Sequence, residues 1–278
     1  MTNTSEPHPV TGQPVGLPVD ATPAQRPSPV MLEGRHGHIE RLAQRHDAAL
    51  WKAVQGHDHI WTYMSYGPLA DLAAFSAWLA GRVKLDDPYS YAIIDRSGQA
   101  VGIATLMEIR PAMRVIEVGN ILYSPALQRT PLGTEAQYLL ARYAFETLGY
   151  RRYEWKCNAL NDPSCRAALR YGFVYEGMFR QHMITKSRSR DTAYYSMLDS
   201  EWPARKVAFE RWLAPENFDA QGRQRMSLSE LNAVRAAGPF PRPAKRGEGA
   251  ERSEAGEGRC SHVSPKCAPH PARPFSLR

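Results

Sequence analysis

One join in the sequence, between an apolar strand and a helix, constrains the fold more than any other feature. The run Val115–Tyr123 is almost entirely apolar and predicts a strand, and a turn follows at Ser124-Pro125. A helix then begins at Thr130-Pro131, because threonine is a good N-cap and proline is favoured at the first helical position. Such a join leaves backbone N–H groups at the positive end of a helix, where an anion can bind.

This loop alone admits two interpretations. Residues 128–136 either hold an anion or begin an ordinary capped helix, whose first turn we expect to include Glu135. The choice between them depends on the sequence further downstream.

Further motifs follow the predicted helix in a fixed order. A short strand at 153–157 leads to an Asn-x-x-Ser motif at residues 161–164, then to a short helix and to a Gly-Phe-x-x-Glu-Gly motif at 172–177. The runs 190–198 and Glu201-Trp202 complete the pattern. Together these motifs resemble the GNAT acetyltransferase superfamily, and within it the RimJ/RimL-type N-acetyltransferases. The resemblance covers residues 30–202.

The two ends of the chain differ in composition from its middle. Residues 1–29 and 236–278 each hold seven of the 22 prolines, and neither shows a sustained apolar period. We therefore expect a disordered tail at 1–29, a GNAT-like domain at 30–202, a helical extension at 203–235, and a disordered, low-complexity tail at 236–278.

The net charge of +7 is unevenly distributed. The last 43 residues contribute +4 and the first 29 contribute −1, which leaves +4 for the core. This modest core charge suits an enzyme with a phosphorylated cofactor about as well as a nucleic-acid binder. Nucleic-acid binding ranks last, because the basic residues of the tail alternate with glutamates and form no basic cluster.

Cysteine usage and hydropathy indicate a cytoplasmic protein. Two of the four cysteines lie in the core and two in the tail, which does not suggest a disulfide framework. No apolar run is long enough to span a membrane, and the N-terminus lacks the pattern of a signal peptide. The spacing Cys260-x-His262 and Cys267-x-x-His270 is similar to that of zinc ligands, but no apolar residues surround it, so we expect no metal.

The apolar patterns predict an α/β fold. The GNAT resemblance implies a mixed, mostly antiparallel sheet of six or seven strands, with one splayed pair of strands and with flanking helices. The aromatic segment 57–68, with Trp61 and Tyr63, either forms a wall of the acceptor site, as is common in the family, or covers the core. The expected strands are 30–42, 89–95, 100–109, 115–123, 153–157, 173–184 and 192–198, and the expected helices are 47–55, 71–83, 132–148, 163–171 and 202–213.

The resemblance implies that acetyl-CoA is the acetyl donor and that the loop before the long helix binds its pyrophosphate. The family pattern is Gln/Arg-x-x-Gly-x-Gly/Ala; Gln128 and Gly133 fit it, but Pro131 stands where the first glycine is expected. Proline has no N–H, so one backbone donor is lost and we expect weaker or altered cofactor binding. The loop residues expected at the cofactor are Gln128, Arg129, Thr130, Leu132, Gly133 and Thr134.

The strand before the loop is expected to hold the thioester end of the cofactor. A bulge at Gly119-Asn120 would expose the backbone of Ile121, Leu122 and Tyr123 to the pantetheine arm. Asn161 is a further cofactor contact or only the cap of the short helix.

Ser164 is the expected general acid. In the RimJ/RimL-type branch this role has been assigned to the serine of Asn-x-x-Ser, and the alternative is that Ser164 is an ordinary early-helix residue. The tyrosine that many GNAT enzymes use is replaced here by Ala168, and Tyr171 is out of register.

Glu117 is the expected general base, with Glu108 and His182 as alternatives. An α-amine needs little help from a base, because it titrates near ~7.7–8.0.

The resemblance thus implies an acetyl-CoA-dependent N-acetyltransferase. The acceptor would be a primary amine, either a protein N-terminus or a small-molecule amine, which attacks the thioester directly. The alternative is a catalytically silent module that binds coenzyme A for regulation, because both Pro131 and the missing tyrosine depart from the family pattern.

Overall fold

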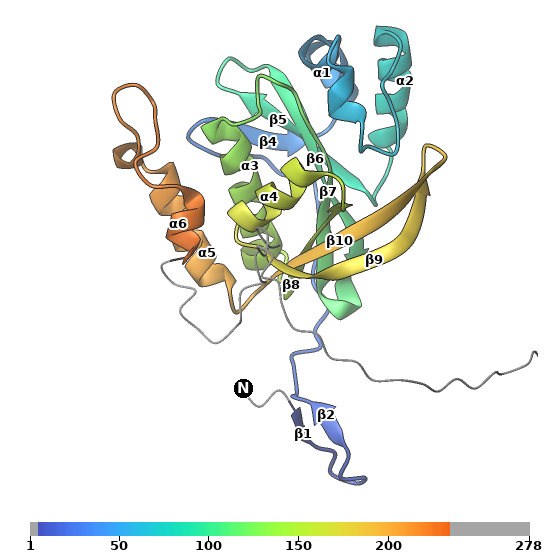
Figure 1. Cartoon of the computed structure of the whole chain (residues 1–278), viewed down its shortest axis with the longest axis vertical. Helices are drawn as coiled ribbons and strands as arrows, with labels where there is room; N and C mark the ends of the chain where they lie inside the picture. The colour runs from blue at the N-terminus through green and yellow to red at the C-terminus, as the bar shows by residue number, and fades with distance from the viewer. Residues whose placement is uncertain (1–4, 234–278) are drawn as a thin grey trace, which may run out of the picture. The chain divides into compact units, whose positions relative to one another are not determined.

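Eight strands form one mixed sheet in the computed structural model, which describes residues 5–233 (Figure 1). Every neighbouring pair of strands is antiparallel except one parallel pair near the middle. The predicted α/β fold with a mixed, mostly antiparallel sheet is therefore confirmed, with eight strands instead of six or seven. In sheet order the strands are β3 (Leu32–Glu33), β4 (Gly37–Arg41), β5 (Tyr89–Asp95), β6 (Ala100–Arg110), β7 (Val115–Tyr123), β8 (Arg152–Asn158), β10 (Arg188–Leu198) and β9 (Val174–Thr185).

Two predicted elements are divided in the structure. The strand expected at 30–42 becomes β3 and β4, because the chain turns between them and Gly34 donates to the carbonyl of Gly37. The helix expected at 132–148 is α-helical only to Arg142, and a π-helical turn follows at Tyr143–Thr147. The first three residues of this turn, Tyr143, Ala144 and Phe145, are buried. The helices are α1 (Asp47–Val54), α2 (Leu72–Arg82), α3 (Pro131–Arg142), α4 (Asp162–Arg170), α5 (Trp202–Leu213) and α6 (Leu228–Ala233).

Consecutive residues of β5 enter two different apolar cores, one on each face of the sheet. Tyr91 and Ile93 pack with α3, whereas Ala92 and Ile94 pack with α1 and α2. Successive side chains of a strand point to opposite faces, so a strand that is covered on both faces is apolar throughout. The stripe predicted for α3 lies in the first core, with Leu132, Ala136, Leu139, Leu140 and Tyr143.

The buried carboxylate of Glu135 joins the turn between β3 and β4 to α3. Its two oxygens accept hydrogen bonds from the backbone N–H groups of Arg35 and His36, both at 2.7 Å. A Cβ atom on Gly34 would overlap this carboxylate, so the turn requires glycine there. We expected Glu135 in the first turn of its own helix; it lies one residue beyond that turn and binds a different segment.

Residues 5–29 differ from the disordered tail that we expected for 1–29. Strands β1 (Ser5–Pro7) and β2 (Pro14–Gly16) form a hairpin. Further along, the N–H groups of Ala24 and Gln25 donate to the carbonyls of Pro111 and Leu148, at 3.1 and 2.8 Å. A proline lacks a backbone N–H, but the other residues of the segment keep theirs. Two of these N–H groups form hydrogen bonds with carbonyls of the domain. The low-complexity tail and its Cys260, His262, Cys267 and His270 lie outside the described residues.

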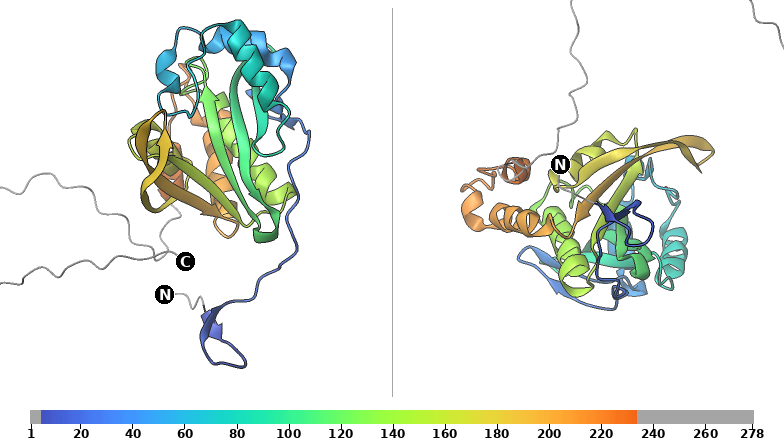
Figure 2. Two further views of the ribbon diagram at one scale, coloured as in Figure 1. Left: turned by 90° about the vertical axis from the view of Figure 1, so that its right-hand side faces the viewer. Right: turned by 90° about the horizontal axis from the view of Figure 1, so that it is seen from below.

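The C-terminal helix α5 lies beside α3, and α6 lies beside α5 and α4 (Figure 2). Trp202 stacks on Tyr138 and Phe145, and Phe209 packs against Tyr138 and Tyr171. These aromatic contacts make α5 continuous with the main core. No helix within residues 5–233 is both long and apolar enough to cross a membrane.

We expect Glu135→Ala to lower the free energy of unfolding by about 2–4 kcal/mol, because it leaves two backbone N–H groups without their charged acceptor. Urea denaturation at pH 7 would measure this. Glu216→Ala, which removes an exposed carboxylate, should change stability by less than about 0.5 kcal/mol. Equal stability of both variants would contradict the anchoring role of Glu135.

Candidate functional site

Strands β7 and β8 diverge after four residues of parallel pairing, and a cleft opens between them. The pairing ends at Val118 with Trp155. Just beyond this point, residues 119–122 of β7 oppose the shorter segment 103–105 of β6, and Asn120 takes a left-handed φ of 47°. An extra residue of this kind bends the strand and increases its twist. The splayed pair and the bulge predicted at this position are both present.

The cleft has a volume of about 1620 Å³ and brings together most of the predicted site. It runs from the end of β7 to the starts of α3 and α4, with β10 on one side. Ten of the twelve predicted site residues line it: Glu117, Ile121, Tyr123, Gln128, Arg129, Thr130, Gly133, Thr134, Asn161 and Ser164.

Leu122 and Leu132 are the two predicted residues whose side chains do not line the cleft. Leu122 is buried in the core under α1 and α2, and Leu132 in the core under α3. Only their backbone atoms remain as possible ligand contacts.

The loop before α3 presents three backbone donors. Thr130 is the N-cap and Pro131 the first residue of α3, as predicted. The N–H groups of Gly133 and Thr134, expected at the cofactor, donate to the hydroxyl and the carbonyl of Thr130, at 3.1 and 3.4 Å. Among the described residues, the N–H groups at positions 129, 130 and 132 have no acceptor. These three remain for an anion.

Tyr123 fastens this loop to the end of β7. Its hydroxyl donates to the carbonyl of Gly133 at 2.9 Å and accepts from the amide of Gln137 at 2.8 Å. The Gln128 side chain donates to the Tyr123 carbonyl at 3.0 Å. Burial raises the pKa of Tyr123 well above its usual value, so this hydroxyl is a fixed donor in the structure.

Ser164 lies at the opposite wall, in the first turn of α4. Its hydroxyl accepts a hydrogen bond from the Trp155 indole at 3.1 Å and can still donate its own proton. The Asn161 side chain caps α4 by accepting from the Ser164 N–H at 3.2 Å. Asn161 therefore has the structural role that we considered, although it also lines the cleft.

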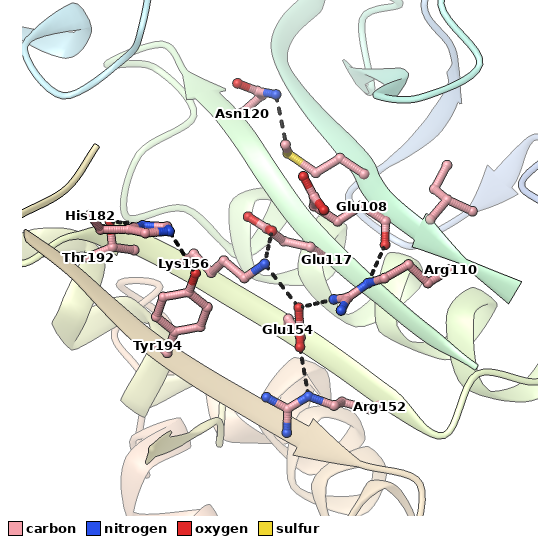
Figure 3. A network of polar contacts seen from close by, with 12 residues as sticks. Glu108, Arg110, Glu117, Asn120, Arg152, Glu154, Lys156, His182, Thr192 and Tyr194 are labelled. Carbon is pink, nitrogen blue, oxygen red and sulfur yellow. Dashed lines mark hydrogen bonds and ion pairs between the residues drawn. The ribbon is translucent and has the colours of Figure 1, made fainter. Parts of the chain in front are cut away.

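Glu117 belongs to a chain of alternating charges on the floor of the cleft (Figure 3). Lys156 lies between two carboxylates, 2.9 Å from Glu117 and 3.1 Å from Glu154. Arg110 binds the same Glu154 oxygen as Lys156, at 2.6 Å, and Arg152 binds the other oxygen, at 2.8 Å. Glu154 thus has three cationic partners, whereas Glu117 shares one.

This difference separates the proton affinities of the two carboxylates. Burial raises the pKa of Glu117, Lys156 lowers it only in part, and the result is about 7. Burial also raises the pKa of Glu154, but Arg152, Lys156 and Arg110 outweigh it and hold the pKa below its usual value. Glu117 therefore exchanges a proton near neutral pH, as a general base requires.

The two alternative bases are placed less favourably. Glu108 lies at the rim of the cleft with an exposed side chain. His182 lies 3.1 Å from the Thr192 hydroxyl and 3.4 Å from the Tyr194 hydroxyl, on the far side of Lys156 from Glu117 (Figure 3). Neither the Glu108 carboxylate nor the His182 ring forms an ion pair with the charged residues around Lys156.

Two hydrogen bonds join the aromatic segment 57–68 to distant parts of the chain. The Tyr63 hydroxyl donates to the carbonyl of Leu160, at 2.9 Å. Lys186, at the tip of the β9–β10 hairpin, donates to the carbonyl of Trp61, at 2.8 Å. Trp61 is buried in the core, as one interpretation of the aromatic segment predicted, whereas Tyr63 lines the cleft. The segment as a wall of the acceptor site stays a prediction.

Sequence reasoning missed Lys156, Tyr194 and Arg170, which also line the cleft. Lys156 and Glu154 are two residues apart on a predicted strand, so a shared charged face was readable. Tyr194 pairs in register with Lys156 across β10 and β8, and no local signal indicates that pairing. No group of three or more acidic, histidine or cysteine side chains within residues 5–233 could hold a metal ion.

Comparison with known proteins finds relatives that all belong to one family. Residues 39–174 match the family described as an acetyltransferase (GNAT) domain. The chain is 47% identical to a GCN5-related N-acetyltransferase from Brucella melitensis, with a TM-score of 0.75 over 77% of this chain and 99% of that one. It is 40% identical to a GNAT-family protein from Chromobacterium violaceum, with a TM-score of 0.65 over 71% and 100% of the two chains.

A curated relative from Bacillus subtilis, YdaF, is named provisionally as a ribosomal N-acetyltransferase. It is 28% identical to this chain over 109 residues. The match covers 39% of this chain and 59% of the length of that relative.

The pKa of Glu117 predicts a pH-dependent stability. Between pH 4.5 and 7 the folded chain keeps this proton while the unfolded chain loses it, so the free energy of unfolding falls as pH rises, by about 3 kcal/mol in total. Urea denaturation from pH 4.5 to 8 should show this fall in the native chain and not in Glu117→Gln. Glu108→Gln should keep it. Parallel profiles of the native chain and Glu117→Gln would contradict the raised pKa.

Proposed function

The chain belongs to the GNAT family and is an N-acetyltransferase, and we propose that it moves the acetyl group of acetyl-CoA to a primary amine. The observation that carries this proposal is the cleft itself, where a splayed pair of strands meets a helix start with unused backbone donors. These two features suit the two ends of a long, phosphorylated thioester.

The residues of the cleft fit acetyl-CoA. Three N–H groups, at positions 129, 130 and 132, have no acceptor among the described residues and suit a diphosphate. Arg129, whose backbone φ is left-handed, also lines the cleft with its charged side chain. Within the described part of the chain, the end of β7 from Gly119 to Tyr123 has no strand partner on the β8 side, which leaves backbone for an amide-containing arm. When bound, acetyl-CoA supplies the activated acetyl group.

In the proposed mechanism, Glu117 and Ser164 divide the two proton transfers. Glu117, ionised above about pH 7 and oriented by Lys156, takes a proton from the acceptor amine directly or through a water molecule. Ser164, oriented by the Trp155 indole, directs its hydroxyl proton to the leaving sulfur. The acceptor attacks directly, and burial raises the pKa of the Cys157 thiol to about 12, which does not suit a nucleophile.

For the acceptor we propose a protein N-terminus, as in the RimJ/RimL-type branch, with a small-molecule amine as the second choice. The provisional name of YdaF as a ribosomal N-acetyltransferase supports the first. An acceptor of this kind implies action in the cytoplasm.

A silent module that binds coenzyme A remains the second candidate function, because Pro131 removes a donor from the loop. The near-neutral pKa of Glu117 favours the enzyme over this module, since a silent site has no use for a titrating carboxylate.

The proposal predicts micromolar binding of acetyl-CoA by calorimetry and release of a free thiol that depends on an added amine. The amines would be peptides with free N-termini, matched N-acetylated peptides as controls, and a set of small amines. Binding without thiol release on any acceptor would favour the silent module. Absence of binding would refute both candidate functions.

The two proton-transfer roles predict separate defects. We expect Glu117→Gln and Ser164→Ala each to lower kcat at least about 100-fold, with little change in acetyl-CoA affinity. In the native enzyme kcat/KM should rise as the pH passes through about 7, and in Glu117→Gln this rise should be absent. The exposed Ser189→Ala serves as a control for Ser164→Ala. Full activity of Ser164→Ala would reassign the acid, with the Tyr194 hydroxyl as the next group in the cleft.

A further inference from the structure

Arg170, the last residue of α4, holds its charged group beside the start of α3. One guanidinium nitrogen donates to the hydroxyl of Thr134 at 3.1 Å, and the side chain lines the cleft. The guanidinium lies 5.4 Å from the ring centre of Tyr171 and 4.8 Å from that of Trp212. Two aromatic rings and one hydroxyl therefore set its position.

This cation has no carboxylate partner among the described residues. No acidic side chain in residues 5–233 approaches the Arg170 guanidinium within 4.0 Å. Burial lowers the pKa of Arg170, and the neighbouring Tyr171 offsets this effect only in part. By contrast Arg166, one turn earlier on α4, pairs with Asp162. A partly buried, unpaired guanidinium at the edge of a cleft is suited to bind an anionic ligand.

A second polar group in the same region also lacks a partner. The side-chain oxygen of Gln137 is buried, lines the cleft and accepts no hydrogen bond from the described residues. Gln137 lies one turn beyond Gly133 on α3, and its amide nitrogen is fixed by Tyr123. Within residues 5–233, the region between α3 and α4 thus holds a cation without a carboxylate partner and an acceptor oxygen without a donor.

The C-terminal helices hold Arg170 in this position. Asn232 of α6 donates to the backbone carbonyl of Arg170 at 3.0 Å. Trp212 of α5, whose ring lies under the guanidinium, is itself fixed by its indole donating to Gln224 at 2.8 Å. Trp212, Gln224 and Ser229 also line the cleft. These residues lie outside the segment 39–174 that matches the family, so this wall is an addition to the matched domain.

We propose that Arg170, positioned by Trp212 and α6, binds a phosphate group of the cofactor and extends the anion site at the start of α3. This inference rests on the proposed use of acetyl-CoA. A planar guanidinium presents paired donors that match phosphate oxygens, and its charge offsets the N–H that Pro131 lacks. The ligand is a phosphate ester, which coenzyme A carries both in its diphosphate and on its ribose.

The test is calorimetric titration of the full chain with coenzyme A and with dephospho-coenzyme A, which lacks the ribose phosphate. We expect Arg170→Met to weaken coenzyme A binding at least about tenfold, because it removes charged hydrogen bonds to phosphate. Arg170→Lys should weaken binding less, since lysine keeps the positive charge and loses only the paired donors of the guanidinium. Arg211→Met, an exposed arginine on α5 outside the cleft, should bind as the native chain does.

The second ligand identifies the phosphate. If Arg170 binds the ribose phosphate, the native chain and Arg170→Met will bind dephospho-coenzyme A equally; if it binds the diphosphate, the variant will lose affinity for both ligands. Trp212→Leu should reproduce part of the defect while the chain stays folded by circular dichroism. Native affinity of Arg170→Met for coenzyme A would overturn the proposal. Failure of the native chain to bind coenzyme A would instead overturn the proposed function.

Discussion

The site depends on the early end of one strand pairing. Strands β7 and β8 run parallel for four residues and then separate, and nearly every feature of the cleft follows from that separation. The bulge at Asn120 bends β7 away from its partner, and the loop at the end of β7 carries the chain to the start of α3. A continued parallel ladder would use the backbone of residues 119–123 for the sheet and leave no cleft.

The paired part of the same two strands creates the ionic chain. Parallel register sets Glu117 directly opposite Glu154, an arrangement of like charges that is unfavourable without a cation. Lys156 lies between them, and two arginines also pair with Glu154. Because the cations are distributed unequally, one carboxylate remains ionised and the other titrates near neutral pH. The asymmetry is thus a property of the sheet register.

Local patterns in the sequence predicted most of the fold and the loop before α3, and they failed where the contact is long-range. Apolar runs and cap residues located β7 and α3, and a lone glycine with asparagine located the bulge. No such pattern locates Arg170, whose importance comes from Thr134 and Trp212, 36 and 42 positions away in the sequence. The composition of residues 5–29 gave a wrong prediction. The prolines suggested disorder, but other residues of the segment keep backbone N–H groups that form hydrogen bonds with the domain.

The last wall of the cleft has a consequence for how the protein is made. Trp212, Gln224 and Ser229 are among the final described residues, whereas the strand that begins the cleft ends at Tyr123. During synthesis the chain leaves the ribosome from its N-terminus, so β7 and the loop before α3 emerge well before α5 and α6. The cleft is therefore completed late. A nascent chain that ends before Trp212 contains the strands and the loop but lacks the contacts of Arg170 with Trp212 and Asn232.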